Sequence, residues 1–217
     1  MTDTMTDPMT DPMTDPLPLF PLRMVLFPDA VLGLNVFEAR YLDLISDCLR
    51  TQRPFGVICL REGSEAGRST GPVALHEVGT LAAIDSVDAE QAGLLTVRCT
   101  AGQRFRLNGQ PVQRDNGLWV APVTLLPQDP LRMPGPAVLK TVTALGEAIR
   151  KLKERDAEPF SMPYRLDDAG WVANRWCELL PISLEARQKL MELDDPVIRL
   201  SLVDGYLRDK QVVFGQD

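Results

Sequence analysis

The start of the chain combines short apolar clusters with prolines. Clusters of Leu, Val, Phe and Met are interrupted by Pro18, Pro21 and Pro28. Because proline has no N–H for a ladder hydrogen bond, the pattern predicts short strands at a sheet edge or corner, with a turn at Pro28-Asp29. The second of these strands is expected at 31–36.

The spacing of apolar residues then becomes helical. They recur at intervals of three, four, seven and eight positions, with charged residues between them, which predicts one stripe of an amphipathic helix packed against the sheet. The stripe consists of Tyr41, Leu44, Ile45, Cys48 and Leu49.

The middle of the chain predicts further short strands, separated by glycine-containing turns. They are expected at 54–60, 78–87, 94–100, 103–107 and 118–126. Many short strands without helices between them favour an antiparallel sheet curled on itself. The loop 61–71 is rich in Gly and Ser, but the spacing of Gly63 and Gly67 and the following Arg68 do not fit a phosphate-binding loop. We therefore expect no nucleotide site.

A proline-rich segment separates this part from a helical one. Residues 127–136 contain four prolines and one glycine. Beyond them, four helices are predicted: one with a stripe that begins at Val138, one around Trp171, one capped by Ser183 and one that starts at Asp195-Pro196. The predicted class is α+β. The predicted division of the chain is a tail at 1–16, a β subdomain at 17–127, a linker at 128–136, a helical bundle at 137–210 and a C-terminal tail at 211–217.

The first sixteen residues repeat the unit T-D-P-M. Units begin at Thr6, Thr10 and Thr14, with a variant at Thr2. A proline at every fourth position excludes a helix, and so little apolar surface cannot offset the entropy of ordering, so we expect a disordered tail. The tail contains four aspartates and neither Lys nor Arg, so the formal charge of −7 leaves only −3 for the rest of the chain. This mild acidity gives no basic footprint for nucleic acid.

Catalytic and metal-binding patterns are missing from the sequence. Four scattered cysteines without a CxxC pair, and a single histidine, His76, favour reduced, buried thiols over a zinc site. We find no nucleophile with a matching base and expect no cofactor. No apolar run is long enough to span a bilayer and no secretory signal is present, so a cytoplasmic protein is expected.

Several strings together resemble one family. Residues 17–44, LPLFPLRMVLFPDAVLGLNVFEARYLDL, resemble the opening of the Lon protease N-terminal, substrate-binding domain, with its pattern PLFPL, FP and L-V-FE-RY. The segments that agree further are 55–57, 76–80, 102–107 and 183–191, so the resemblance extends over residues 17–208.

The resemblance implies a PUA-like β pseudobarrel followed by a small helical bundle. It also implies a non-catalytic polypeptide-recognition module, an adaptor for proteolysis or protein quality control. Its expected partners are unfolded or degron-bearing polypeptides and a protease or chaperone. Full-length Lon proteases continue with an ATPase module and a serine-lysine protease module, whose motifs this sequence lacks. We therefore expect an ATP-independent, stand-alone domain that is not an enzyme.

Two sets of residues are candidates for polypeptide binding. Met24, Val25 and Leu26 are more apolar than a solvent loop requires, so they belong either to the core or to a recognition patch. Glu38 and Arg40 match the FE-RY motif, and they form either an ion pair at the start of the helix or part of the binding surface. The peptide itself is expected to use an exposed strand edge or an apolar cleft.

Two other functions remain open at this point. PUA-like barrels elsewhere bind RNA, and an RNA-binding face would use Arg98, Arg104, Arg106 and Arg114. An enzyme would need a pocket lined by His76 or Glu77. The client, the partner and the oligomeric state do not follow from the sequence.

Overall fold

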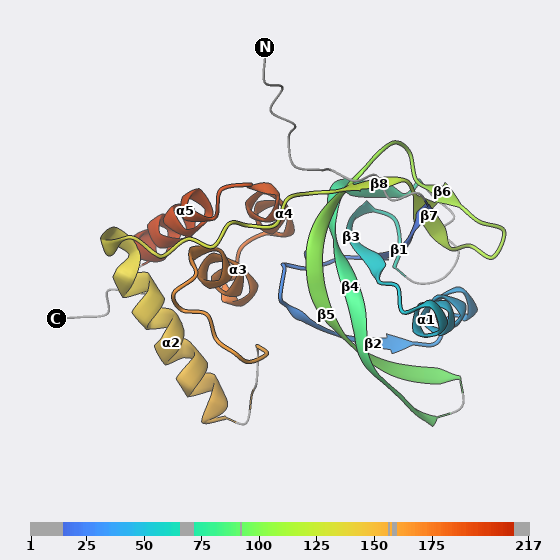
Figure 1. Cartoon of the computed structure of the whole chain (residues 1–217), viewed down its shortest axis with the longest axis horizontal. Coiled ribbons are helices and arrows are strands. Elements are labelled where there is room, and N and C mark those ends of the chain that lie inside the picture. The colour runs from blue at the N-terminus through green and yellow to red at the C-terminus, as the bar shows by residue number, and fades with distance from the viewer. Residues whose placement is uncertain (1–14, 66–71, 92, 156, 158–159, 211–217) are drawn as a thin grey trace, which may run out of the picture.

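The computed structural model describes residues 15–65, 72–91, 93–155, 157 and 160–210. Figure 1 shows two lobes side by side: all the strands and α1 form one, and α2 to α5 form the other. The β lobe contains β1 (Leu17–Leu22), β2 (Val31–Val36), α1 (Ala39–Thr51), β3 (Phe55–Glu62), β4 (Ala74–Gln91), β5 (Leu94–Leu107), β6 (Val112–Gln113), β7 (Trp119–Ala121) and β8 (Val123–Leu125). The helical lobe contains the short 3-10 helix η1 (Pro136–Val138), α2 (Leu139–Lys153), α3 (Ala169–Leu179), α4 (Leu184–Glu192) and α5 (Pro196–Asp209). The two predicted tails and the second half of the 61–71 loop lie mostly outside the described residues.

The strands form one mixed sheet, which confirms the α+β class. Its order is β2-β5-β4-β3-β1-β7-β6, with β8 paired to β5. The sheet is not wholly antiparallel, because β1 and β3 run parallel. After β1 the chain passes through β2 and α1 and re-enters the sheet beside β1 in the same direction, as a crossover with a helix allows. Within the described residues the sheet does not close into a barrel, since β2 and β6 stand at its two ends.

The proline-containing strand β1 lies inside the sheet rather than at its edge. It pairs with β3 on one side and with β7 on the other. The pairing with β7 covers only Leu17 to Leu19, so the ladder on that side ends before Pro21. The predicted turn at Pro28-Asp29 is present, and Asp29 adopts a positive φ of 63°.

A buried phenylalanine packs against two glycines in the middle of the sheet. Phe105 of β5 is fully buried, and its ring passes over Gly56 of β3 and Gly79 of β4. A Cβ atom added at Gly79 would lie 2.5 Å from the Val57 carbonyl oxygen and 2.6 Å from Phe105 Cζ. Only a residue without a side chain lets the backbone and the ring approach so closely. The close packing of β3, β4 and β5 at this point therefore requires glycine at both positions.

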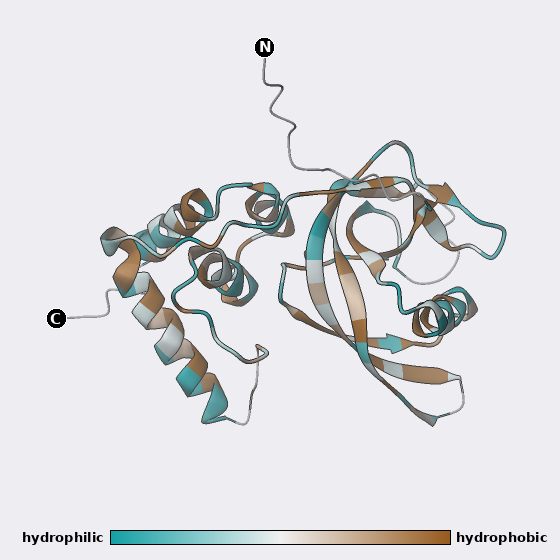
Figure 2. Cartoon of the chain, in the orientation of Figure 1, coloured by the Kyte–Doolittle hydropathy of each residue, from teal (hydrophilic) through white to brown (hydrophobic). Residues whose placement is uncertain are grey.

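The helices begin and pack as their sequences predict. Ser183 accepts a hydrogen bond from the Ala186 N–H at 3.1 Å, and Asp195 accepts one from the Val197 N–H at 2.8 Å. These are N-caps. On α1 the predicted stripe is buried except for Leu49, which is 49 % exposed. Figure 2 shows hydrophobic and hydrophilic residues alternating along α2, as an amphipathic helix requires.

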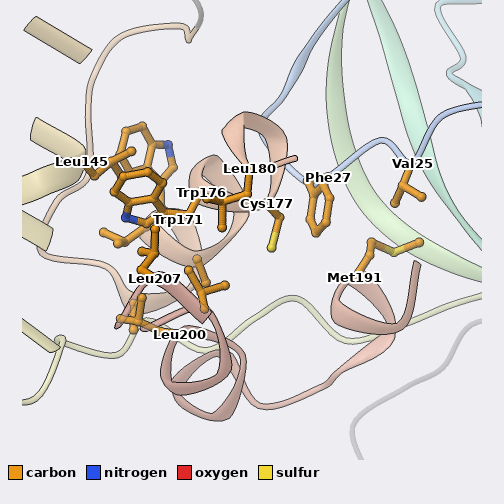
Figure 3. Close-up of a cluster of buried hydrophobic side chains, with 14 of the residues drawn as sticks. Val25, Phe27, Leu145, Trp171, Trp176, Cys177, Leu180, Met191, Leu200 and Leu207 are labelled. Carbon is orange, nitrogen blue, oxygen red and sulfur yellow. The ribbon is translucent and has the colours of Figure 1, made fainter. Parts of the chain in front are cut away.

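The two lobes share part of their cores. One buried cluster fills the space between the sheet and α1. A second cluster fills the helical lobe and also takes in four residues of the β lobe, namely Val25, Phe27, Cys59 and Val78. Figure 3 shows Phe27 beside Cys177 of α3 and Val25 beside Met191 of α4. Apolar contacts thus join the residues before and after the segment 128–136. The domain boundary predicted at this segment stays a prediction.

The four cysteines are free and buried. Burial raises the pKa of Cys48 and Cys59 to about 11 and that of Cys99 and Cys177 to about 12. Because the thiolate is the reactive form, we expect iodoacetamide near neutral pH to leave all four unmodified in the native protein and to alkylate all four in concentrated guanidinium chloride. Intact mass measurement distinguishes the two results. Alkylation of any cysteine in the native protein would contradict the burial.

Candidate functional site

A groove lies on the β lobe between the start of β1, the C-terminal half of α1 and the turn before β7. Its volume is about 790 Å³. Apolar side chains from five separate segments line it: Leu17 of β1, Leu44 and Cys48 of α1, Leu81 of β4, Leu118 before β7 and Leu125 of β8. Leu81 and Leu125 are partly exposed, whereas Leu44, Cys48 and Leu118 are buried. The groove therefore has an apolar floor of the kind that receives side chains of a bound chain.

Three arginines stand around this floor. Arg50 pairs with Asp47 at 2.8 Å, and Arg53 pairs with Asp15 at 2.9 Å. Arg114 has no carboxylate within ion-pair distance among the described residues, although its side chain lines the groove. The rim is thus net positive and largely exposed to solvent.

Local sequence explains why α1 can supply both floor and rim. The apolar stripe of α1 faces the sheet, and its members Leu44 and Cys48 form part of the floor. The helix ends at Gln52, whose positive φ of 53° turns the chain back towards β3. Arg50 and Arg53 flank this turn and remain in solvent beside the floor.

Glu38 and Arg40 lie outside the groove and contact the turn that forms part of its wall. Arg40 is 9 % exposed, and it lies 2.9 Å from the Glu38 carboxylate and over the Tyr41 ring. It also donates a hydrogen bond to the carbonyl oxygen of Gly117 at 3.1 Å. The turn 114–118 places both Arg114 and Leu118 at the groove. The hydrogen bond from Arg40 to this turn therefore connects the groove wall to α1. The pair is more buried than the surface pair that the sequence predicted.

The segment Met24-Val25-Leu26 lies in the core rather than on a surface. Val25 is 5 % exposed and Leu26 is 3 % exposed, while Met24 is partly buried. Val25 belongs to the cluster of the helical lobe and Leu26 to the cluster under α1, so successive side chains enter different cores. The segment is apolar on both sides because it lies between two lobes. Leu26→Asp is therefore expected to unfold the protein rather than to weaken binding alone.

The four arginines of the RNA alternative do not lie on one exposed face. Arg104 is 3 % exposed and donates hydrogen bonds to the carbonyl oxygens of Met191 and Leu193. Arg98 and Arg106 are exposed on β5, and Arg106 lies 3.8 Å from Glu77. Arg114 lies apart from them, at the groove. Since its middle member is buried between the lobes, the set does not form a continuous track for phosphates.

A buried ionic cluster fastens the lobes and was not expected from the sequence. Asp129 of the connecting segment pairs with Arg104 of β5 at 3.1 Å and with Arg199 of α5. Arg199 also donates a hydrogen bond to the Asn174 side chain at 3.0 Å. A second contact between the lobes comes from Arg175 of α3, which donates hydrogen bonds to the carbonyl oxygens of Pro28 and Asp29, both at 2.7 Å. The charges of Arg104, Arg175 and Arg199 are therefore compensated by carboxylates within the protein.

The residues of a possible enzyme site lie elsewhere. His76 lies 3.9 Å from Glu185 and Glu77 is 82 % exposed. Burial lowers the pKa of His76 below its ordinary value, and Glu185 opposes that shift. Neither residue lines the groove.

Sequence reasoning did not single out the residues of the groove. Arg50, Arg53, Leu81 and Leu125 come from segments that are distant in sequence, and each fits an ordinary surface or strand position. Of the residues predicted to bind polypeptide or RNA, only Arg114 lines the groove. The sequence signal that could have pointed to it is the pair Arg50 and Arg53 at the end of an amphipathic helix.

In the part of the chain that the structure describes, no helix is both long and apolar enough to cross a membrane.

Comparisons with known proteins place the chain in a family. Residues 16–209 match the family described as the ATP-dependent protease La (LON) substrate-binding domain. A solved structure described as a Lon N-terminal domain protein from Xanthomonas campestris is similar, with a TM-score of 0.72 and 35 % identity over 88 % of this chain and 98 % of that one. The N-terminal domain of Mycobacterium avium complex Lon protease shares the fold, with a TM-score of 0.58 and 16 % identity over 90 % of this chain and 99 % of that one.

A curated relative is also similar over most of the chain. It is Lon protease 2 of Syntrophobacter fumaroxidans, which is 26 % identical over 199 residues. These residues are 88 % of this chain but only 24 % of the relative, so the chain spans about a quarter of the length of that protein. Since the family match, the fold and the similar structure agree, the chain belongs to the family of Lon substrate-binding domains.

Proposed function

We propose that this domain is a non-catalytic polypeptide-recognition module and that the groove beside α1 is its binding surface. The observation that carries the proposal is the combination of an open apolar floor with an arginine rim on a substrate-binding domain. Its clients are unfolded or degron-bearing polypeptides in the cytoplasm. The module acts as an adaptor that presents them to a protease or chaperone.

The chemistry of the groove suits an extended chain. Apolar client side chains are removed from water against Leu81 and Leu125, which contributes about 25 cal/mol for each Å² buried. The arginines of the rim bind acidic side chains or carbonyl oxygens of the client. Such a shallow, solvent-open site is expected to bind with micromolar affinity, about −8 kcal/mol.

Removing the apolar floor is expected to weaken client binding. In the double variant Leu81→Ala, Leu125→Ala, each substitution removes about 1 kcal/mol of contact, so affinity should fall by about tenfold or more. The probe is a fluorescein-labelled, carboxymethylated polypeptide that cannot fold, and the measurement is fluorescence anisotropy. Circular dichroism shows whether the variant is folded.

The matched control is Leu95→Ala. Leu95 of β5 is also partly buried but does not line the groove. It should lower stability by a similar amount and leave the affinity unchanged. Equal binding by the wild type, the double variant and the control would refute the groove as the binding surface.

A further inference from the structure

The N-terminal repeat reaches the groove. Asp15 and Pro16 belong to the unit that begins at Thr14, and both line the groove together with Leu17 and Pro18. The Asp15 carboxylate lies 2.9 Å from Arg53 on the rim. One Asp-Pro step of the repeat therefore forms part of the groove wall, with its carboxylate on a rim arginine.

The rest of the repeat matches the groove in charge. Residues 1–16 contain four aspartates and no basic residue. The rim presents Arg50, Arg53 and Arg114 against a single aspartate of α1, Asp47. Arg114 has no carboxylate partner among the described residues, so one cation of the rim is available for another aspartate of the repeat.

The repeat also matches the groove in chemistry. Asp3, Asp7, Asp11 and Asp15 recur at every fourth position, which is about 12–14 Å in an extended chain. The prolines favour this extended form, and the methionines are flexible apolar side chains suited to a leucine floor. Each unit thus offers a carboxylate to an arginine and an apolar group to the floor.

We propose that the N-terminal repeat is a built-in occupant of the groove and competes there with client polypeptides. This inference rests on the proposed function, since it assigns to the same groove a preference for acidic, extended segments that contain proline and methionine. A segment tethered at Asp15 has an effective concentration on the order of millimolar. Even if the repeat binds in cis with a dissociation constant of about 100 μM, it should therefore weaken the binding of a separate ligand by about tenfold.

The test uses the full chain and a peptide with the sequence of residues 2–13, labelled with fluorescein. Its affinity is measured by anisotropy for the wild type and for the variant Asp3→Asn, Asp7→Asn, Asp11→Asn, whose tail keeps its length but loses three charges. The peptide should bind the variant about tenfold more tightly, because the tethered competitor is weakened. High salt should weaken the binding to both proteins.

Groove variants made in the triple Asn background, where the tethered tail competes weakly, locate the binding. Arg53→Glu and Arg114→Glu should each weaken peptide binding by about fivefold or more, since they place a negative charge opposite the aspartates. The control is Arg98→Glu, a change of an exposed arginine on β5 outside the groove, and it should leave the affinity unchanged. An equal loss with Arg98→Glu would indicate general charge attraction and would overturn the assignment to the groove.

Other results also overturn the inference. Equal affinity of the peptide for the wild type and the triple Asn variant, or no binding to either, shows that the repeat does not compete in the groove. The carboxymethylated polypeptide is measured against the same proteins and against the double variant Leu81→Ala, Leu125→Ala. If its binding still depends on Leu81 and Leu125, the proposed function stands without the inference, and if it does not, both fail.

Discussion

Replacing Asp129 with alanine is expected to destabilise the protein by about 3–5 kcal/mol, because it leaves two buried guanidinium groups without their shared counterion. Arg104 and Arg199 are 3 % and 1 % exposed, and both pair with the Asp129 carboxylate. Burial lowers the pKa of Arg104 and the charge of Asp129 raises it, so the carboxylate stabilises the charged arginine where it lies. The charge of Arg199 also lowers the pKa of Arg104, and without Asp129 no shared counterion offsets the repulsion between the two arginines.

The chain offers a matched control on the same arginine. Asp194 lies 3.5 Å from Arg104 but is 84 % exposed, so water replaces it at little cost. Asp194→Ala should change the free energy of unfolding by about 0.5 kcal/mol or less. Urea denaturation followed by tryptophan fluorescence measures both variants, and equal losses would show that the cluster is not effectively buried.

A third variant separates the charge effect from packing. Asp129→Ala combined with Arg104→Met and Arg199→Met removes all three charges and retains long apolar side chains. Because the cost of the single change is mainly the uncompensated charge, the triple variant should recover part of the lost stability. If it is less stable than Asp129→Ala, the hydrogen bonds of the arginines to backbone carbonyls matter more than their charge.

The features that the sequence predicted well are those set by neighbouring residues. The stripe of α1 and the caps at Ser183 and Asp195 follow from local spacing and local hydrogen bonds. They depend on four or five consecutive positions, so a single sequence contains the necessary information. The turn at Pro28-Asp29 is local for the same reason.

The features that the sequence did not predict depend on distant partners. Nothing in residues 17–22 specifies a parallel partner at 55–62 or a place inside the sheet. Likewise, the apolar segment Met24-Val25-Leu26 fits a binding patch and a core equally well until its neighbours on both sides are known. Asp129 resembles an ordinary linker aspartate until Arg104 and Arg199 converge on it. The groove is hidden in the same way, because its lining residues meet only after the sheet has curled.

Three segments that carry the family resemblance meet at one point of the fold. The segments 55–57, 76–80 and 102–107 bring Gly56, Gly79 and Phe105 together. The sequence identifies these segments separately, but only the register of β3, β4 and β5 places the ring over both glycines. This contact explains physically why the two strands need glycine at these positions.

Gly79→Ala is accordingly expected to destabilise the protein by about 3 kcal/mol or more, the upper range for overpacking a core. The new Cβ would stand 2.5 Å from the carbonyl oxygen of Val57, which belongs to the backbone of β3. That backbone is paired with β1 on one side and β4 on the other, so it cannot move without breaking ladder hydrogen bonds. Phe105→Leu in the same chain should recover little, because it relieves the contact with the ring but not the contact with the carbonyl.

Two other glycines test this reasoning. At Gly102 the nearest atom to an added Cβ is 3.8 Å away, so Gly102→Ala should change stability by no more than about 1 kcal/mol. At Gly56 the atoms nearest to an added Cβ are side-chain atoms of Leu17, Leu19 and Phe105. Gly56→Ala should therefore be destabilising but should recover partly when combined with Phe105→Leu, unlike Gly79→Ala. Thermal unfolding of these five variants measures the differences. If Phe105→Leu rescued both glycine variants equally, the ring and not the β3 backbone would limit the approach of the strands.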